Sequence, residues 1–242
     1  MEKKYTFEEL TEIIKTLRSE NGCPWDREQT HTSLKPCMTE EAAELLAGIR
    51  IYDTTGDYDN MREELGDILL QVVMHSQIAN EEGLFSIEDV ITKISEKMIR
   101  RHPHVFGDVK ADTAEEVLSN WDEIKKKEKE NVSWIESPLR EIPIELPSVT
   151  RAVKVLKKQD KLYGNVPDNK ETFLRLKDMI SGMESLLEEE DADKKKLEEL
   201  YAETLLLMSN IAMRNKIQAE QVLTDKIEEI IDKYEPKSGK LP

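Results

Sequence analysis

Residues 63–78, EELGDILLQVVMHSQI, form the longest and most apolar helical pattern in the chain. Their large aliphatic side chains recur three and four positions apart, at Leu65, Ile68, Leu69, Val72, Val73 and Ile78. This spacing gathers them on one face of an α-helix, because a strand would instead alternate apolar and polar positions. We therefore predict a long helix here, at the centre of a helical bundle.

The same periodicity extends on both sides of this segment. It predicts further helices at residues 6–20, 38–53, 87–101 and 114–130. Ser86-x-x-Asp89 and Thr113-x-x-Glu116 are typical of capping boxes, which open helices by satisfying free backbone N–H groups. Segment 23–26 interrupts the pattern. Segment 102–107 contains Pro103 and Gly107, which are expected to keep it in a loop. The predicted fold class is all-α.

Two tandem helical domains are expected, separated by a linker. The linker is placed at 131–147, since its three prolines cannot sustain a helix. It divides a first domain, 1–130, from a second domain, 148–235, which is followed by a tail at 236–242. Periodic segments in the second domain fall at 148–160, 170–190, 194–214 and 218–235.

Composition limits the expected partners and compartment. The chain has 242 residues, and 51 Asp and Glu against 35 Lys and Arg give it a formal charge of −16. We expect neither a nucleic-acid polymer nor a membrane as partner, because both attract clustered cations. No stretch reaches the ~18 apolar residues of a membrane span, and MEKKYTFEEL lacks the apolar core of a signal peptide. Cys23 and Cys37 match no zinc spacing and are expected to be reduced thiols in a cytoplasmic protein.

Two acidic clusters, EEAAE and EELGD, occupy consecutive predicted helices. In each, two carboxylates three positions apart share a helix face, Glu41 with Glu44 and Glu64 with Asp67. Antiparallel neighbouring helices would let the four converge, and they would repel one another unless a cation lay between them. All-oxygen ligation suits Mg²⁺, with Mn²⁺ as the alternative. Gly66 lowers helix propensity and indicates close approach of another backbone or a ligand. The competing interpretation is a solvated acidic helix face.

Cationic side chains suited to phosphate lie at the end of the helix predicted at 87–101. Lys97 and Arg101 share a face at four-residue spacing, Arg100 is adjacent, and arginine forks bind phosphate oxygens. The alternative role of these residues is to complement the helix dipole. Trp25 and Trp121 are candidates for stacking on a base, although a tryptophan at helical spacing is more often part of a core.

Four separate motifs give the chain a specific resemblance. They are GCPWD at 22–26 followed by Gln29-Thr30, EExxE at 40–44, ELGD at 64–67 and RRHPHVFG at 100–107. Their order and spacing strongly resemble the MazG nucleoside triphosphate pyrophosphohydrolases. The resemblance is close over residues 6–130, and the chain from residue 146 is similar more loosely to the second of the tandem MazG domains common in the family. It implies an all-α fold, dimerisation and Mg²⁺-dependent hydrolysis of a nucleoside triphosphate to the monophosphate and pyrophosphate.

The resemblance also implies roles for individual residues. It gives four metal ligands, Glu41, Glu44, Glu64 and Asp67. It gives four contacts to the triphosphate and nucleotide, Lys97, Arg100, Arg101 and Trp121. Glu40 is the implied group that positions or deprotonates the water that attacks the α-phosphorus, with no covalent intermediate.

The second domain departs from the family pattern. The sequence DMISG, which begins at Asp178, stands where EExxE is expected, and LYAE, which begins at Leu200, stands where ExxD is expected. Because three or more ligands are missing, we expect no metal site in 148–235, whose helices suit packing or dimerisation. Two other functions stay open: a non-catalytic helical scaffold that binds nucleotides or a partner helix, and a pyrophosphatase restricted to one non-standard or deoxy nucleotide.

Overall fold

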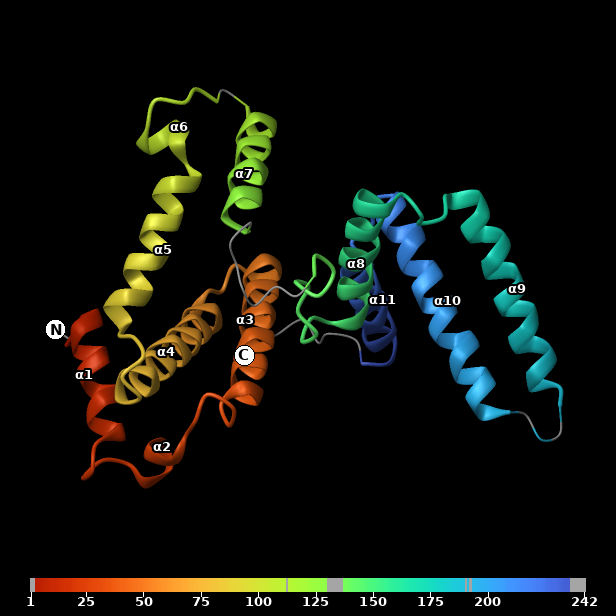
Figure 1. Ribbon diagram of the computed structural model, residues 1–242. Coiled ribbons are helices and arrows are strands. Elements are labelled where there is room, and N and C mark those ends of the chain that lie inside the picture. The colour runs from red at the N-terminus through yellow and green to blue at the C-terminus, as the bar shows by residue number, and fades with distance from the viewer. Residues whose placement is uncertain (1–2, 112, 130–136, 190, 192, 236–242) are drawn as a thin grey trace. The chain divides into compact units, whose positions relative to one another are not determined.

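The computed structural model describes residues 3–111, 113–129, 137–189, 191 and 193–235. Within these ranges the chain forms eleven helices and no strand, which confirms the all-α prediction. The chain divides into two compact units, Met1–Glu130 and Asn131–Pro242 (Figure 1). No helix in the described ranges is long and apolar enough to cross a membrane.

The first unit is built from helices of very different lengths. In chain order they are α1 (Phe7–Arg18), α2 (Pro24–Glu28), α3 (Lys35–Thr55), α4 (Asp59–Glu81), α5 (Ile87–Arg101), α6 (Pro103–Phe106) and α7 (Ala114–Lys129). The short helices α2 and α6 correct the sequence expectation of a break at 23–26 and a loop at 102–107. Each begins with a proline, whose fixed φ suits the first helical position and whose missing N–H is not needed there.

Both predicted capping motifs open helices. The Ser86 hydroxyl accepts from the Asp89 N–H at 3.4 Å, and the Asp89 carboxylate accepts from the Ser86 N–H at 2.8 Å. The Thr113 hydroxyl accepts from the Glu116 N–H at 3.2 Å. These bonds satisfy backbone donors that have no partner inside a helix, and they fix where α5 and α7 begin.

The core of the first unit lies between α1, α4 and the start of α3. Its buried members are Ile14, Leu34, Val73, Met74 and Ile78. Burial of each such side chain contributes roughly 1.5–3 kcal/mol, so this cluster is the main apolar support of α4. The C-terminal half of α4 therefore has the central place predicted for it.

A buried arginine joins α1 and α2 to the end of α4. The side chain of Arg18 is 5% exposed, and it donates to both carboxylate oxygens of Glu81, from Nε at 3.0 Å and Nη2 at 2.7 Å. It also donates to the backbone carbonyl of Asp26 at 2.5 Å. The turn between α1 and α2 needs Gly22, because a Cβ there would lie 2.2 Å from the carbonyl oxygen of Leu17.

The N-terminal half of α4 is less enclosed than the predicted place at the centre of a bundle implies. Leu65 is 51% exposed and Leu69 is 38% exposed. Leu46 and Ile49 of α3, at 68% and 39%, are also at the surface. A single chain therefore leaves large aliphatic side chains in water on the two helices that carry the acidic clusters.

The second unit is also helical. It contains α8 (Ser148–Tyr163), α9 (Asn169–Leu187), α10 (Lys194–Arg214) and α11 (Ala219–Tyr234), and α10 packs against both α8 and α9. The buried Asn210 amide donates to the carbonyl of Pro167 at 2.9 Å and to the Thr172 hydroxyl at 2.8 Å. Arg214 forms a two-pronged ion pair with Asp160, both distances being 2.9 Å. These polar contacts hold the connection between α8 and α9.

The segment predicted as a linker is described in part. Residues 137–147 form turns and bends without a helix, as their prolines predict. Residues 131–136 of the predicted linker and the predicted tail, 236–242, lie outside the described residues.

Candidate metal centre

The site is built on the pair of helices α3 and α4. The chain reverses between them at Gly56, whose φ of 77° lies in the left-handed region that glycine adopts without strain. Gly48 allows the two helices to touch, because a Cβ at that position would lie 2.9 Å from the Cα of Met61. Gly66, the glycine for which the sequence indicated a close approach, has no atom within 4 Å of an added Cβ among the described residues. The close approach between the two helices therefore occurs at Gly48 instead of Gly66.

Three carboxylates converge between these helices. Glu41 of α3 and Glu64 and Asp67 of α4 each offer a ligand atom, and these atoms all lie within 4.8 Å of one another. Glu64 is 9% exposed and accepts at 2.9 Å from the side-chain amide of Asn60, one turn earlier. That bond fixes one carboxylate while it leaves oxygens free for a further partner.

The electrostatics of the cluster favour a cation. Burial and the nearby charges of Asp67, Glu44 and Glu64 raise the pKa of Glu41 above its ordinary value. The cost of holding these charges together disappears when a divalent ion lies among them. The all-oxygen donor set matches Mg²⁺ or Mn²⁺ and does not match zinc, which prefers nitrogen and sulfur. The residues present therefore fit a hard divalent cation.

The other two acidic residues implied by the resemblance are on the same stretch of α3. Glu44 is exposed and close enough to Glu41 for its charge to raise the pKa of that carboxyl, so it borders the cluster. Glu40 is exposed and adjacent to Glu41 in the chain. An amide oxygen adds to the polar surface of α4, because Oε1 of the buried Gln71, one turn after Asp67, has no hydrogen-bond partner in the described chain.

The predicted phosphate-binding residues form a second cluster at the end of α5. Arg100 donates from Nε to Oε1 of Glu128 on α7 at 2.7 Å, and its Nη2 forms an ion pair with the same oxygen at 2.6 Å. Arg101 donates from Nε and Nη2 to Oε2 of the same carboxylate, at 3.1 and 2.5 Å. The hydrogen bonds from Arg101 and Arg100 lower the pKa of Glu128 to about 2. Lys97 is half-buried one turn before Arg101.

An aromatic group lies beside this arginine pair. The guanidinium carbon of Arg101 is 6.0 Å from the centre of the Trp121 ring, and the His102 ring is 5.9 Å from the same ring. The indole N–H of Trp121 and Nδ1 of His104 are buried without a hydrogen-bond partner in the described residues. Trp121 thus has both a stacking face and an unused donor, which a bound base could engage.

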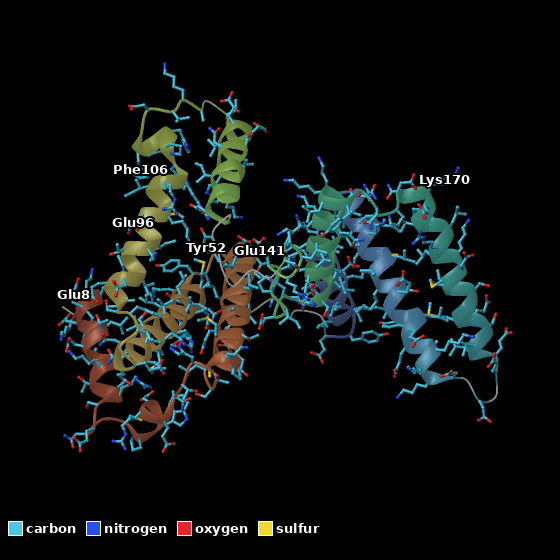
Figure 2. All side chains as sticks on the ribbon, viewed as in Figure 1. Glu8, Tyr52, Glu96, Phe106, Glu141 and Lys170 are labelled. Carbon is cyan, nitrogen blue, oxygen red and sulfur yellow. The ribbon has the colours of Figure 1, made fainter. Side chains whose placement is uncertain are left out.

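The structure does not bring all the predicted site residues together within one chain. The helix α5 packs against α4, α6 and α7, and its C-terminal end and α6 lie away from the α3–α4 pair (Figure 1). Figure 2 labels Tyr52 on α3 and Phe106 on α6, and the two residues lie apart in the first unit. Trp25, 60% exposed on α2, is not part of either cluster in the described contacts.

Two functional candidates escaped the sequence reasoning. Asn60 and Glu128 carry no motif, and their roles depend on which side chain faces them in space. For Asn60 the spacing of four residues before Glu64 is a usable signal, because such residues meet on one helix face. No comparable signal exists for Glu128, whose partners lie on another helix.

Within its described residues, the second unit contains no acidic group comparable to that of α3 and α4. Among the described residues, Glu41, Glu64 and Asp67 form the one group of three or more potential ligands that meets. Gly182 of α9 is the last residue of DMISG, the segment found where EExxE was expected. A Cβ added at Gly182 would meet the side chain of Leu200 at 3.3 Å. This part of α9 thus packs on an apolar side chain of α10.

Known proteins are similar to this chain both in the region of the two clusters and over most of its length. The sequence profile described as "MazG nucleotide pyrophosphohydrolase domain" matches residues 29–106, which contain both acidic clusters and the arginine pair. The Thermotoga maritima protein named "Nucleoside triphosphate pyrophosphohydrolase/pyrophosphatase MazG" is 36% identical over 228 residues. That alignment covers 94% of this chain and 84% of the relative.

Two other relatives match over shorter stretches. The Bacillus subtilis "Uncharacterized protein YabN" is 52% identical over 153 residues, 63% of this chain and 30% of the relative. The Escherichia coli K12 "Nucleoside triphosphate pyrophosphohydrolase" is 45% identical over 150 residues, 62% of this chain and 55% of the relative. The chain thus spans about half or less of these two proteins, whereas it aligns with most of the Thermotoga protein. On the strength of that near full-length match, this chain belongs to the MazG family of nucleotide pyrophosphohydrolases.

Proposed function

We propose that the protein hydrolyses nucleoside triphosphates to the nucleoside monophosphate and pyrophosphate, with Mg²⁺ as cofactor. The observation that carries this proposal is the convergence of Glu41, Glu64 and Asp67 within 4.8 Å on two packed helices. Such a group is costly without a cation and offers the ligands that Mg²⁺ prefers. The names of the Thermotoga and Escherichia relatives support the same reaction.

The residues of the first unit have separate tasks in this reaction. Glu41, Glu64 and Asp67, with Glu44 beside them, would hold Mg²⁺; Mn²⁺ is the alternative ion. When bound, the ion supplies neutralisation of phosphate charge and acidification of water in the site. Glu40 takes a proton from the water whose oxygen attacks the α-phosphorus. The bond to the bridging oxygen breaks, and pyrophosphate leaves without a covalent intermediate.

The second cluster would hold the nucleotide. Lys97, Arg100 and Arg101 supply positive charge for the departing pyrophosphate, and arginine forks match phosphate oxygens. Trp121 offers its ring and its unpaired N–H to the base. Trp25, which is exposed on α2, offers a further ring for stacking on the base.

We infer that the working form is a homodimer. The carboxylates are on α3 and α4, whereas the arginine pair is at the C-terminal end of α5, which lies away from that helix pair. A second copy would place both groups around one triphosphate. The exposed aliphatic side chains of α3, α4 and α5 supply a surface for that copy; they include Leu46, Ile49, Leu65, Ile91 and Ile94. Burial of such a surface gains ~25 cal/mol for each Å² removed from water.

The cellular setting is inferred from charge and thiols. Cys23 and Cys37 are both unpaired, as expected for a reducing compartment, and we place the protein in the cytoplasm. The formal charge of −16 disfavours nucleic-acid polymers and anionic membranes as partners.

Product analysis across a panel of nucleotides tests the proposed reaction. Purified protein with Mg²⁺ should convert several triphosphates to monophosphate and pyrophosphate in equal amounts. Turnover of a single non-standard or deoxy nucleotide would narrow the proposal to a restricted pyrophosphatase. Binding of nucleotide without turnover, with no Mg²⁺-dependent thermal shift, would replace it with a non-catalytic scaffold.

A further inference from the structure

Glu128 engages Arg100 and Arg101 in a way that leaves part of each guanidinium unused. One carboxylate oxygen accepts from Nε of Arg100 and forms an ion pair with its Nη2, and the other accepts from Nε and Nη2 of Arg101. The Glu128 side chain is 19% exposed, and that of Arg101 is 13% exposed. The contact between Glu128 and Arg101 is therefore enclosed, whereas the Arg100 side chain is 52% exposed and leaves one side of the pair open to solvent.

The remaining edges of the two arginines are available. A guanidinium presents five N–H donors on two edges, and Glu128 takes the Nε–Nη2 edge of each. Neither Nη1 group has a hydrogen bond to the part of the chain that the structure describes. One carboxylate thus holds the Nε–Nη2 edges of both arginines and leaves both Nη1 groups for a further partner.

Without Glu128, the same two side chains would not keep this arrangement. Adjacent guanidinium groups repel each other, and long arginine side chains lose conformational entropy when they are held in one geometry. The carboxylate between them offsets the repulsion and fixes both forks before a ligand arrives. The ring of Trp121, 6.0 Å from the Arg101 guanidinium carbon, supports that arginine from a further side.

We propose that Glu128 is a positioning residue that holds Arg100 and Arg101 as a preformed fork for the phosphates of the substrate. This inference rests on the proposed function, because it takes the arginine pair as the phosphate-binding group. Glu128 acts through the arginines and contacts no substrate atom. The opposite behaviour, in which Glu128 competes with phosphate for the arginines, would make its removal strengthen phosphate binding.

The experiment compares three variants of the full chain with wild type. Glu128→Gln keeps the shape and removes the charge, and Glu128→Asp keeps the charge with a shorter reach. Glu115→Gln removes the same charge from an exposed position in the first turn of α7 and serves as the matched control. Two quantities are measured for each: KM and kcat for a nucleoside triphosphate with Mg²⁺, and the Kd of inorganic tripolyphosphate by calorimetry.

For Glu128→Gln we expect KM and the tripolyphosphate Kd to rise ~10-fold, while kcat changes less than KM. Glu128→Asp should recover part of the loss, and Glu115→Gln should match wild type. An unchanged or lower Kd for Glu128→Gln would overturn the proposal, and so would an equal effect of Glu115→Gln. If Glu128→Gln does not fold, Glu128→Asp is the deciding variant. A rise in its tripolyphosphate Kd then supports the proposal, and an unchanged or lower Kd overturns it. The tripolyphosphate measurement needs no turnover, so absence of nucleotide hydrolysis in wild type would count against the proposed function and not against this inference.

Discussion

At the scale of single residues, the acidic site was accessible from the sequence because its spacing is local. Glu64 and Asp67 lie three positions apart on one helix, and Glu41 follows the same rule with Glu44. This local spacing does not show which of the carboxylates meet across the pair of helices. The structure selects Glu41, Glu64 and Asp67, and it adds Asn60 as the donor to Glu64.

Replacement of a cluster carboxylate should separate activity from stability. Glu41→Gln or Asp67→Asn should reduce turnover at least ~100-fold, because a ligand of the cation is lost. The metal-free Glu41→Gln protein should be as stable as wild type or more stable by ~0.5 kcal/mol, since repulsion among the carboxylates falls. The measurements are steady-state turnover, circular dichroism and urea denaturation.

Glu63→Gln is the matched control for these two variants. Glu63 is exposed and next to Glu64 in the chain, but it is not in the converging group. Its turnover should equal that of wild type. Wild-type turnover in both Glu41→Gln and Asp67→Asn would reject the metal centre.

The Arg18–Glu81 pair predicts a pH dependence of stability. The hydrogen bond from Arg18 lowers the pKa of Glu81, so the folded protein holds the ionised carboxylate more strongly than the unfolded chain does. The stabilisation is present above the unfolded pKa of ~4.3 and is lost as the pH falls through the folded value. Glu81→Gln should cost roughly 1 kcal/mol at pH 7 by chemical denaturation. The difference from wild type should shrink below pH 4; a constant difference would disprove the linkage.

At the scale of elements, helix positions followed from periodicity and caps, whereas helix contacts did not. The helix expected near 87–101 spans Ile87–Arg101, and its start agrees because Ser86 and Asp89 form a complete capping box. The two short proline-led helices were missed, since four or five residues give no periodic signal. The role of a glycine also depends on what faces it, so Gly66 was chosen for a close approach that Gly48 makes.

These two glycines predict opposite responses to the same substitution. Gly48→Ala would place a Cβ 2.9 Å from the backbone of Met61, which must shift, and should destabilise the protein by roughly 1–3 kcal/mol. Gly66→Ala meets open space within a helix and should stabilise the metal-free protein by up to ~1 kcal/mol. Urea denaturation of both variants provides the comparison. Equal effects would contradict the packing of α3 on α4 at Gly48.

At the scale of the whole molecule, the pattern of α4 predicted an apolar face but not the surface that covers it. Val73 and Ile78 are buried within the chain, whereas Leu65 and Leu69 are in water. Periodicity reports that a face is apolar and cannot distinguish a core from an interface between copies. The same limit applies to Arg100 and Arg101, whose motif does not predict that Glu128 faces them.

Dimerisation through α3 and α4 is testable by mass. Light scattering on a sizing column should give twice the chain mass of 28.0 kDa for wild type. Leu46→Lys, at a site 68% exposed in one chain, should give a single chain mass, because a buried lysine is costly at an apolar interface. Ile144→Lys, at a site 73% exposed outside the helices, is the matched control and should stay dimeric. A monomeric wild-type protein with full turnover would contradict a site completed by a second copy.

In the proposed reaction, the first unit directs water to the α-phosphorus of a nucleoside triphosphate. Hydrolysis in ¹⁸O-labelled water with Mg²⁺, followed by mass spectrometry of both products, tests it most directly. The label is predicted in the nucleoside monophosphate, with unlabelled pyrophosphate, and Glu41→Gln should incorporate none. Label in pyrophosphate, or formation of nucleoside diphosphate and orthophosphate, would contradict the claim.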